Sequence, residues 1–171
     1  VAATTCLLSV SSAAPAPDGE GHPHPRGKIV VANRESGTIS VIDTHDDEVD
    51  ATITLPAGDN PPEPMYVVNT PRSHRVWVGD RANDQVVAFD RWDFSVDAVV
   101  PAGSGVFHMW ADDRGRQLWV NNDIDNTTTV INPVSLNVLA TVPTPADLVA
   151  MGGKPHDVIL APGGRYAYVT L

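Results

Sequence analysis

The pattern of this chain is clearest in FHMWADDRGRQLWV, residues 107–120, which is a short apolar run, a polar turn and a second apolar run. The same phrase occurs earlier as PMYVV at 64–68 followed by RVWV at 75–78, and later as PHDVIL at 155–160 followed by RYAYV at 165–169. Short apolar runs bounded by turn residues are typical of β-strands. The chain therefore repeats one β-rich unit.

Three landmarks give this repeat one period. The second strand of each unit holds a valine, and the steps from one valine to the next are 47, 42 and 49 residues (Val31, Val78, Val120 and Val169). A polar residue closes the third strand at positions 43, 90 and 132, and a proline closes the fourth at 56, 101 and 143. A period in the forties with four short strands is typical of a β-propeller blade, because stacked blades bury faces that one sheet leaves open.

The sequence thus predicts an all-β chain, a β-propeller of four-stranded blades. The runs at 65–68, 108–111 and 156–160 come first in their units and are expected to line the central tunnel. Residues 28–55 supply only the second, third and outer strands of a blade, and residue 171 falls within the second strand of another unit. We therefore expect residues 28–171 to form a partial ring of about three to four blades, incomplete at its C-terminus.

Two N-terminal segments lack this pattern. Residues 1–16 hold a modest apolar stretch followed by small residues, which predicts a truncated signal peptide and hence a secreted or periplasmic protein. Residues 17–27 are rich in Pro, Gly and His and are expected to be a flexible linker. The single cysteine, Cys6, lies in the first segment, so the repeats contain no disulfide framework and no thiolate metal site.

Composition limits the partners. The net charge is −10, with 11 Lys and Arg residues spread thinly, so the sequence offers no basic stripe for phosphates and nucleic-acid binding is not expected. No apolar run is long enough to span a bilayer. The expected partner is a protein or a small-molecule ligand at the face of the propeller.

Two histidines are the candidate functional residues. His108 and His156 are interpreted as holding one position at the start of successive inner strands, with Met65 in that position in the preceding unit. Imidazoles that converge from several blades can bind copper, zinc or iron, so we predict a metal site on His108 and His156, with copper as a possible cofactor. The alternative is that both are structural and bond to loop backbone. Asp157 is expected to point to the opposite face from His156.

Other side chains are assigned to the fold. The residue before each landmark valine is Val30, Trp77, Trp119 or Tyr168, and we predict that these large side chains pack between neighbouring sheets. Met109 is expected to pack between blades as well. The polar run at 121–126 is interpreted as an Asn/Asp-rich hairpin turn rather than a calcium loop, because it lacks the glycine and terminal glutamate of that motif.

SGTISVID at 36–43 and RYAYVTL at 165–171 resemble YVTN-type propeller repeats, with Leu171 where the tetrad has Asn. The resemblance implies a secreted or periplasmic propeller with seven blades in the full-length protein. Members are similar to the propeller of nitrous oxide reductase, whose copper is held by histidines, to haem d1 propellers and to lactonase-like propellers. A non-catalytic binding module is favoured, and the alternatives are a copper- or haem-linked oxidoreductase or a lactonase-like hydrolase.

Overall fold

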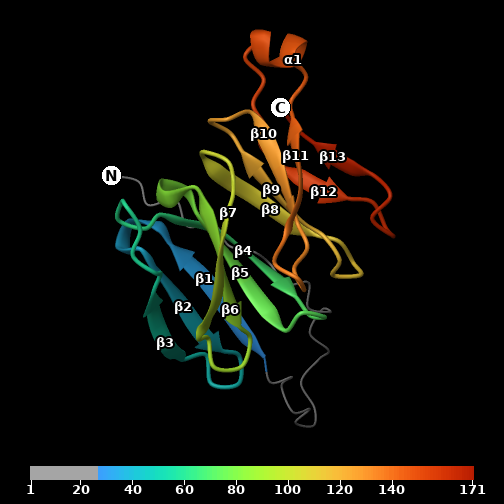
Figure 1. The fold of residues 1–171 in the computed structure, drawn as a ribbon. Coiled ribbons are helices and arrows are strands. Elements are labelled where there is room, and N and C mark those ends of the chain that lie inside the picture. The colour runs from blue at the N-terminus through green and yellow to red at the C-terminus, as the bar shows by residue number, and fades with distance from the viewer. Residues whose placement is uncertain (1–26) are drawn as a thin grey trace, which may run out of the picture.

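The computed structural model describes residues 27–171, which form four antiparallel sheets (Figure 1). The predicted signal peptide at 1–16, Cys6 and residues 17–26 of the predicted linker lie outside these described residues. The first sheet has three strands, β1 (Lys28–Asn33), β2 (Thr38–Asp43) and β3 (Val49–Thr54). The 3₁₀ turn η1 (Arg34–Ser36) joins β1 to β2 and ends at Gly37, whose φ of 66° is the left-handed conformation that the hairpin requires.

Two four-stranded sheets follow, each with its strands in chain order. The second sheet contains β4 (Pro64–Thr70), β5 (Arg75–Asp80), β6 (Gln85–Asp90) and β7 (Val96–Pro101), with the 3₁₀ turn η2 (Arg81–Asn83) between β5 and β6. The third sheet contains β8 (Val106–Ala111), β9 (Leu118–Asn122), β10 (Thr127–Ile131) and β11 (Val138–Pro143). After the short helix α1 (Ala146–Ala150), β12 (Val158–Leu160) pairs with β13 (Ala167–Val169).

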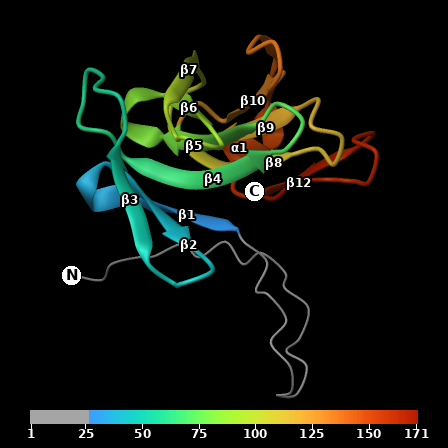
Figure 2. The ribbon, with the colours of Figure 1, turned by 90° about the horizontal axis from the view of Figure 1, so that it is seen from below.

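The inner strands of the second, third and fourth sheets, β4, β8 and β12, form a row. β4 packs beside β8, and β8 beside β12, so the inner strands of successive sheets are neighbours (Figure 2). The outer strands β3, β7 and β11 lie farthest from this row and leave several large apolar side chains exposed. This all-β architecture confirms the predicted partial propeller, with the strands close to the predicted bounds.

The second sheet is buried on both faces. One face, with Val78 and Phe89, packs into a core shared with Ile39 of the first sheet. The other face, with Trp77, packs into a core shared with Met109 of the third sheet, which confirms that Met109 packs between blades. Successive side chains of a strand point to opposite faces, so a strand between two sheets must be apolar at nearly every position. This explains the continuous apolar runs of β5 and β6.

The residues before the landmark valines differ in burial. Trp77 is fully buried, as predicted, and its indole Nε1 donates a 2.9 Å hydrogen bond to Thr70 Oγ1. Trp119 is only half-buried, and Tyr168 is 59% exposed, so the core prediction is wrong for Tyr168. Tyr168 lies on the two-stranded sheet of β12 and β13, where no described blade covers it.

The residue two positions after three of the four landmark valines, Val31, Val78 and Val120, closes a hairpin. The amide Nδ2 of Asn33, at the end of β1, donates to the hydroxyls of Thr38 and Ser40. Asn122, at the end of β9, repeats this with Thr127 and Thr129 at 3.0 and 2.9 Å. In the second sheet the corresponding residue is a carboxylate (Asp80) that accepts from Asn83 and Gln85. A polar side chain at this position therefore ties the second strand to the third.

Replacing Asn122 with alanine is expected to lower the free energy of unfolding by about 1–2 kcal/mol, because the buried hydroxyl of Thr129 and the half-buried hydroxyl of Thr127 lose their donor. Urea denaturation of the full-length protein measures this change. Asn33→Ala is the matched variant, since it removes the same pair of hydrogen bonds from a half-buried site, and it should cost less. Equal losses of stability in the two variants would contradict the expectation that the more buried pair of hydrogen bonds contributes more.

Candidate functional site

The registers of three hairpins define two rows of side chains across the inner strands. Each inner strand pairs one apolar residue with a landmark valine of the second strand. The three pairs are Val67 with Val78, Met109 with Val120, and Val158 with Val169. On each inner strand, we count back from the residue that pairs with the landmark valine, the pairing site. The residue two positions before the pairing site belongs to the first row, and the residue one position before it belongs to the second row. The first row contains Met65, Phe107 and His156, and the second contains Tyr66, His108 and Asp157.

These rows correct one sequence interpretation. His108 and His156 do not hold the same position in their strands, because His156 shares its row with Phe107 and His108 shares its row with Asp157. β4 and β8 each carry an irregularity in register just before the pairing site. Such a bulge breaks the strict alternation of side chains along a strand. The two histidines are nevertheless brought to one surface.

Aromatic rings from neighbouring inner strands contact one another along the rows. The rings of Tyr66 and His108 meet edge-on with centroids 4.6 Å apart, and those of Phe107 and His156 lie 4.9 Å apart. Tyr66 also meets Phe107 at 5.6 Å. These separations are in the range of favourable aromatic pairs. We call Tyr66, Phe107, His108, His156 and Asp157 the inner-strand cluster. Sequence reasoning missed Tyr66 and Phe107, because aromatic residues in strands are usually core.

His108 links two blades. Its Nδ1 accepts a 3.1 Å hydrogen bond from the backbone N–H of Val158, and the side chain is almost fully buried. Because Nδ1 accepts, the proton of the neutral ring is on Nε2, which lies 4.0 Å from Asp157 Oδ1. Burial lowers the pKa of His108 below its ordinary value of 6.5; the nearby His156 lowers it further, and the Asp157 charge opposes them. This hydrogen bond to backbone is what the sequence analysis gave as the alternative to metal binding for His108, namely a structural role.

His156 and Asp157 form the exposed part of the inner-strand cluster. Their side chains are 61% and 48% exposed, and His156 Nδ1 lies 3.3 Å from Asp157 Oδ2. The expectation that Asp157 would point away from the imidazole is therefore wrong. Both residues precede β12, so the alternation of a regular strand does not govern them. The buried amide of Asn121 fixes this segment by donating to the carbonyl of His156 at 3.1 Å. The sequence analysis assigned 121–126 to a turn, whereas Asn121 and Asn122 end β9 and the turn covers residues 123–126.

Arg81 supports Phe107 from the second sheet. Its guanidinium donates to the carbonyls of Gly105 and Val106 and, through Nη2, to Asp123 Oδ2 at 3.2 Å. The guanidinium carbon lies 5.9 Å from the centroid of the Phe107 ring, within the range of a cation–π contact. Arg81 thus fixes the loop that begins β8, and its charge is already neutralised.

The donor set for a metal is small. Within residues 27–171, no group of three or more His, Cys, Asp or Glu side chains is arranged to hold a metal ion. Nδ1 of His108 is used by the Val158 amide, which leaves its Nε2 and the imidazole of His156 as the nitrogen donors near Asp157. The described residues do not complete a site by themselves, and the metal site on His108 and His156 stays a prediction. No helix among the described residues is long and apolar enough to cross a membrane.

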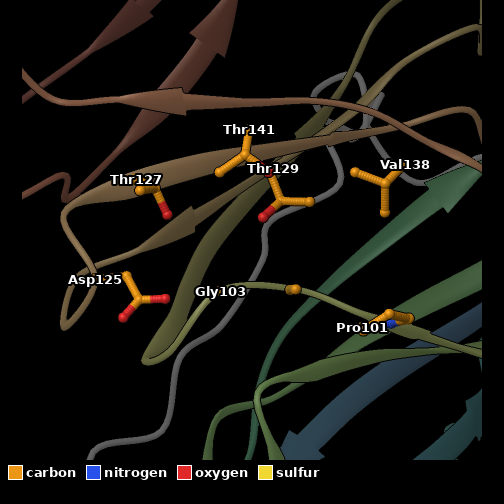
Figure 3. A pocket seen from close by; sticks show the side chains of 8 residues that line it. Pro101, Gly103, Asp125, Thr127, Thr129, Val138 and Thr141 are labelled. Carbon is orange, nitrogen blue, oxygen red and sulfur yellow. The ribbon is translucent and has the colours of Figure 1, made fainter.

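A separate groove of about 320 Å³ lies between the second and third sheets. Asp125, Thr127 and Thr129 face the loop at Gly103 across it (Figure 3). Three of its polar side chains already have partners, since Asp125 Oδ2 accepts from the Ser104 amide and the hydroxyls of Thr127 and Thr129 accept from Asn122. The groove contains no predicted site residue, so the inner-strand cluster remains the candidate site.

No protein-family model matches the chain, and no curated protein matches it. Solved structures do match. The chain is similar to hydrazine synthase from Kuenenia stuttgartiensis, with a TM-score of 0.71 and 14% identity over 83% of this chain and 38% of that one. It is also similar to a 6-phosphogluconolactonase-like protein from Bacteroides uniformis, with a TM-score of 0.67 and 18% identity over 83% of this chain and 46% of that one.

These likenesses concern the fold. The chain spans less than half the length of either structure, and both identities are low. The matches agree with the sheet order and the row of inner strands in showing a β-propeller-like module. The chemistry of a site depends on its own side chains and not on the fold that carries them.

Proposed function

We propose that this chain is part of a secreted or periplasmic propeller-type binding module, and that its ligand binds at the inner-strand cluster. The observation that carries the proposal is the convergence of aromatic rings from β4, β8 and the segment before β12 beside the exposed His156 and Asp157. A surface of this kind suits a ligand with a planar apolar group and a hydrogen-bond donor for the carboxylate. The location is proposed from residues 1–16.

A metal is one candidate ligand. Copper or another transition metal would bind the exposed imidazole of His156 and the Nε2 of His108, with Asp157 beside both. This proposal rests on the chemistry of the donors, and further ligands from outside the described residues would have to complete the coordination.

A lactonase-like hydrolase is the second candidate. In this candidate the exposed His156, whose Nδ1 lies 3.3 Å from Asp157 Oδ2, is the general base, since a carboxylate can orient an imidazole for proton transfer. The 6-phosphogluconolactonase-like neighbour supports a fold that can host such a reaction and nothing more. The copper- or haem-linked oxidoreductase predicted as an alternative requires a bound metal, so the metal content tests it too.

His156→Ala is expected to abolish the function of the inner-strand cluster, because it removes the exposed imidazole while leaving the buried His108 contact in place. We would purify the full-length protein without chelator and measure its metal content, its thermal shift against a small-molecule library and its hydrolysis of δ-lactones. His74→Ala is the matched control, since His74 is an exposed histidine at the other end of the inner strands.

Each outcome separates the candidates. Stoichiometric metal that is lost in His156→Ala and kept in His74→Ala would establish the metal site. A thermal shift that is lost in His156→Ala and kept in His74→Ala, without bound metal, would indicate a binding module for an organic ligand. Lactone hydrolysis that is lost in His156→Ala and kept in His74→Ala would favour the lactonase. If His156→Ala changes none of the three readouts relative to His74→Ala, the proposed function is wrong.

A further inference from the structure

The hairpins that join each inner strand to its second strand meet at the opposite end of the sheets from the inner-strand cluster. Their tips are residues 71–74, 112–117 and 161–166. A Cβ placed on Gly115 would lie 3.3 Å from the Cβ of Arg72, so the first two tips are in contact. The amide of Gly163 donates a 3.2 Å hydrogen bond to Asp113 Oδ2, which joins the third tip to the second. The three tips form one continuous surface.

This surface concentrates positive charge. Arg72, Arg114 and Arg116 are exposed, and among the described residues none of them makes an ion pair or a side-chain hydrogen bond. Arg165, on the third tip, lies over the ring of Tyr166 at 5.6 Å. Four other cationic residues of the described chain pair with carboxylates, and these are Lys28, Arg34, Arg75 and Arg81. We call Arg72, Arg114, Arg116 and Arg165 the arginine rim.

The carboxylates on the second tip, Asp112 and Asp113, bond to backbone amides and form no ion pair with the arginine rim. Asp112 Oδ1 accepts from the backbone amides of Arg116 and Gln117, and Asp113 Oδ2 accepts from that of Gly163. These contacts hold the turns in shape and leave the guanidinium groups without a carboxylate partner. In a chain of net charge −10, a cluster of four arginines on adjoining turns is an exception to the overall acidity.

An exposed tryptophan extends the arginine rim. Trp92, in the turn between β6 and β7, is 73% exposed, and the guanidinium of Arg91 lies 4.5 Å from its ring centroid. The backbone amide of Arg91 donates a 3.0 Å hydrogen bond to the carbonyl of His74, so this turn adjoins the first hairpin tip. Tryptophan and arginine are the residues most enriched among the energetic centres of protein interfaces.

We propose that the arginine rim and Trp92 form a docking surface for an acidic protein segment. Its carboxylates would bind the free guanidinium groups in bidentate pairs, and an apolar side chain would pack on Trp92. A long polyanion such as a nucleic acid fits less well, because the turn at the same end of the first sheet carries Asp46, Asp47 and Glu48. This surface is independent of the function proposed for the inner-strand cluster.

The test is fluorescence anisotropy with the full-length protein and a fluorescein-labelled, glutamate-rich peptide of about ten residues with a central leucine. The combined variant Arg72→Gln, Arg114→Gln and Arg116→Gln is expected to bind about tenfold more weakly than the wild type, and Trp92→Ala about threefold more weakly. Arg34→Gln is the matched control, because Arg34 lies in η1 at the other end of the first sheet, and it should bind like the wild type.

Several results would overturn the proposal. They are no saturable binding of the peptide to the wild type, an equal loss in Arg34→Gln, and tighter rim-dependent binding of a single-stranded oligonucleotide or a phosphatidylserine vesicle than of the peptide. The near-ultraviolet circular dichroism spectrum checks that the combined variant is folded. If it is not folded, the three single variants replace it, and each must then bind more weakly than Arg34→Gln.

Discussion

Replacing Trp77 with alanine is expected to lower the free energy of unfolding by about 3–5 kcal/mol, the largest loss that we expect from one substitution in this chain. Trp77 is fully buried in the core between the second and third sheets. The change would leave a cavity in the core that contains Met109, and it would remove the 2.9 Å hydrogen bond that the indole Nε1 donates to Thr70 Oγ1. A close-packed interior relaxes only partly around such a gap.

Urea denaturation of the full-length protein, followed by circular dichroism, measures this loss. Trp92→Ala is the matched control, since it removes the same side chain from a site that is 73% exposed. The free energy of unfolding of this variant should differ from that of the wild type by no more than about 0.5 kcal/mol. A cost below about 1 kcal/mol for Trp77→Ala would show that the two sheets do not share the core described above.

Replacing His108 with alanine is expected to lower the free energy of unfolding by about 2–3 kcal/mol at a pH near 7.5. The substitution leaves the Val158 amide without its acceptor, and an unsatisfied buried donor is costly. It also opens space beside Tyr66, whose ring meets that of His108. Because the lost contact joins β8 to the segment of β12, the loss should appear first as faster hydrogen exchange at Val158.

His108 also makes stability depend on pH. Its pKa in the folded protein is below the ordinary value of 6.5, mainly because the ring is buried. As the pH falls below about 6.5, the unfolded chain takes up the proton first, so the stability contributed by neutral His108 is complete above that pH and is lost below it. His156 and Asp157 face the ring, and the carboxylate partly offsets the effect.

His108→Gln separates the two effects. The glutamine carbonyl can accept from the Val158 amide but does not titrate, so this variant should retain more stability than His108→Ala and lose less stability than the wild type between about pH 7 and pH 5. Denaturation midpoints at both pH values provide the comparison. The same acid slope in His108→Gln and in the wild type would mean that other groups carry the pH dependence.

The repeat could be predicted from local signals. Apolar runs, turn residues and three landmarks with steps in the forties placed the strands of all four sheets close to their observed bounds. These signals are local because a strand between two sheets needs apolar side chains on both faces and a hairpin needs residues that tolerate a turn. The order of the strands follows from the same pattern, since short connections pair each strand with the next.

The sequence singled out two residues of the inner-strand cluster, His108 and His156, but not the geometry of that cluster. Matching by residue type aligned His108 with His156, whereas the steps of 42 and 49 between landmark valines already align His108 with Asp157. Matching by type failed because it paired two histidines without counting residues from the landmark valines. Whether His108 reaches solvent or a backbone amide depends on the packing of β12 against it.

The sequence alone determined the strands, the blades and the repeat, because each is specified by residues within about fifty positions of one another. Only the tertiary structure decided which side chains meet. It brought Asp157 to both histidines and buried His108 against the next blade. It also joined hairpin tips that are far apart in the sequence into the arginine rim. The physical reason is that contacts between blades depend on how the sheets stack, and no local pattern of residues encodes that arrangement.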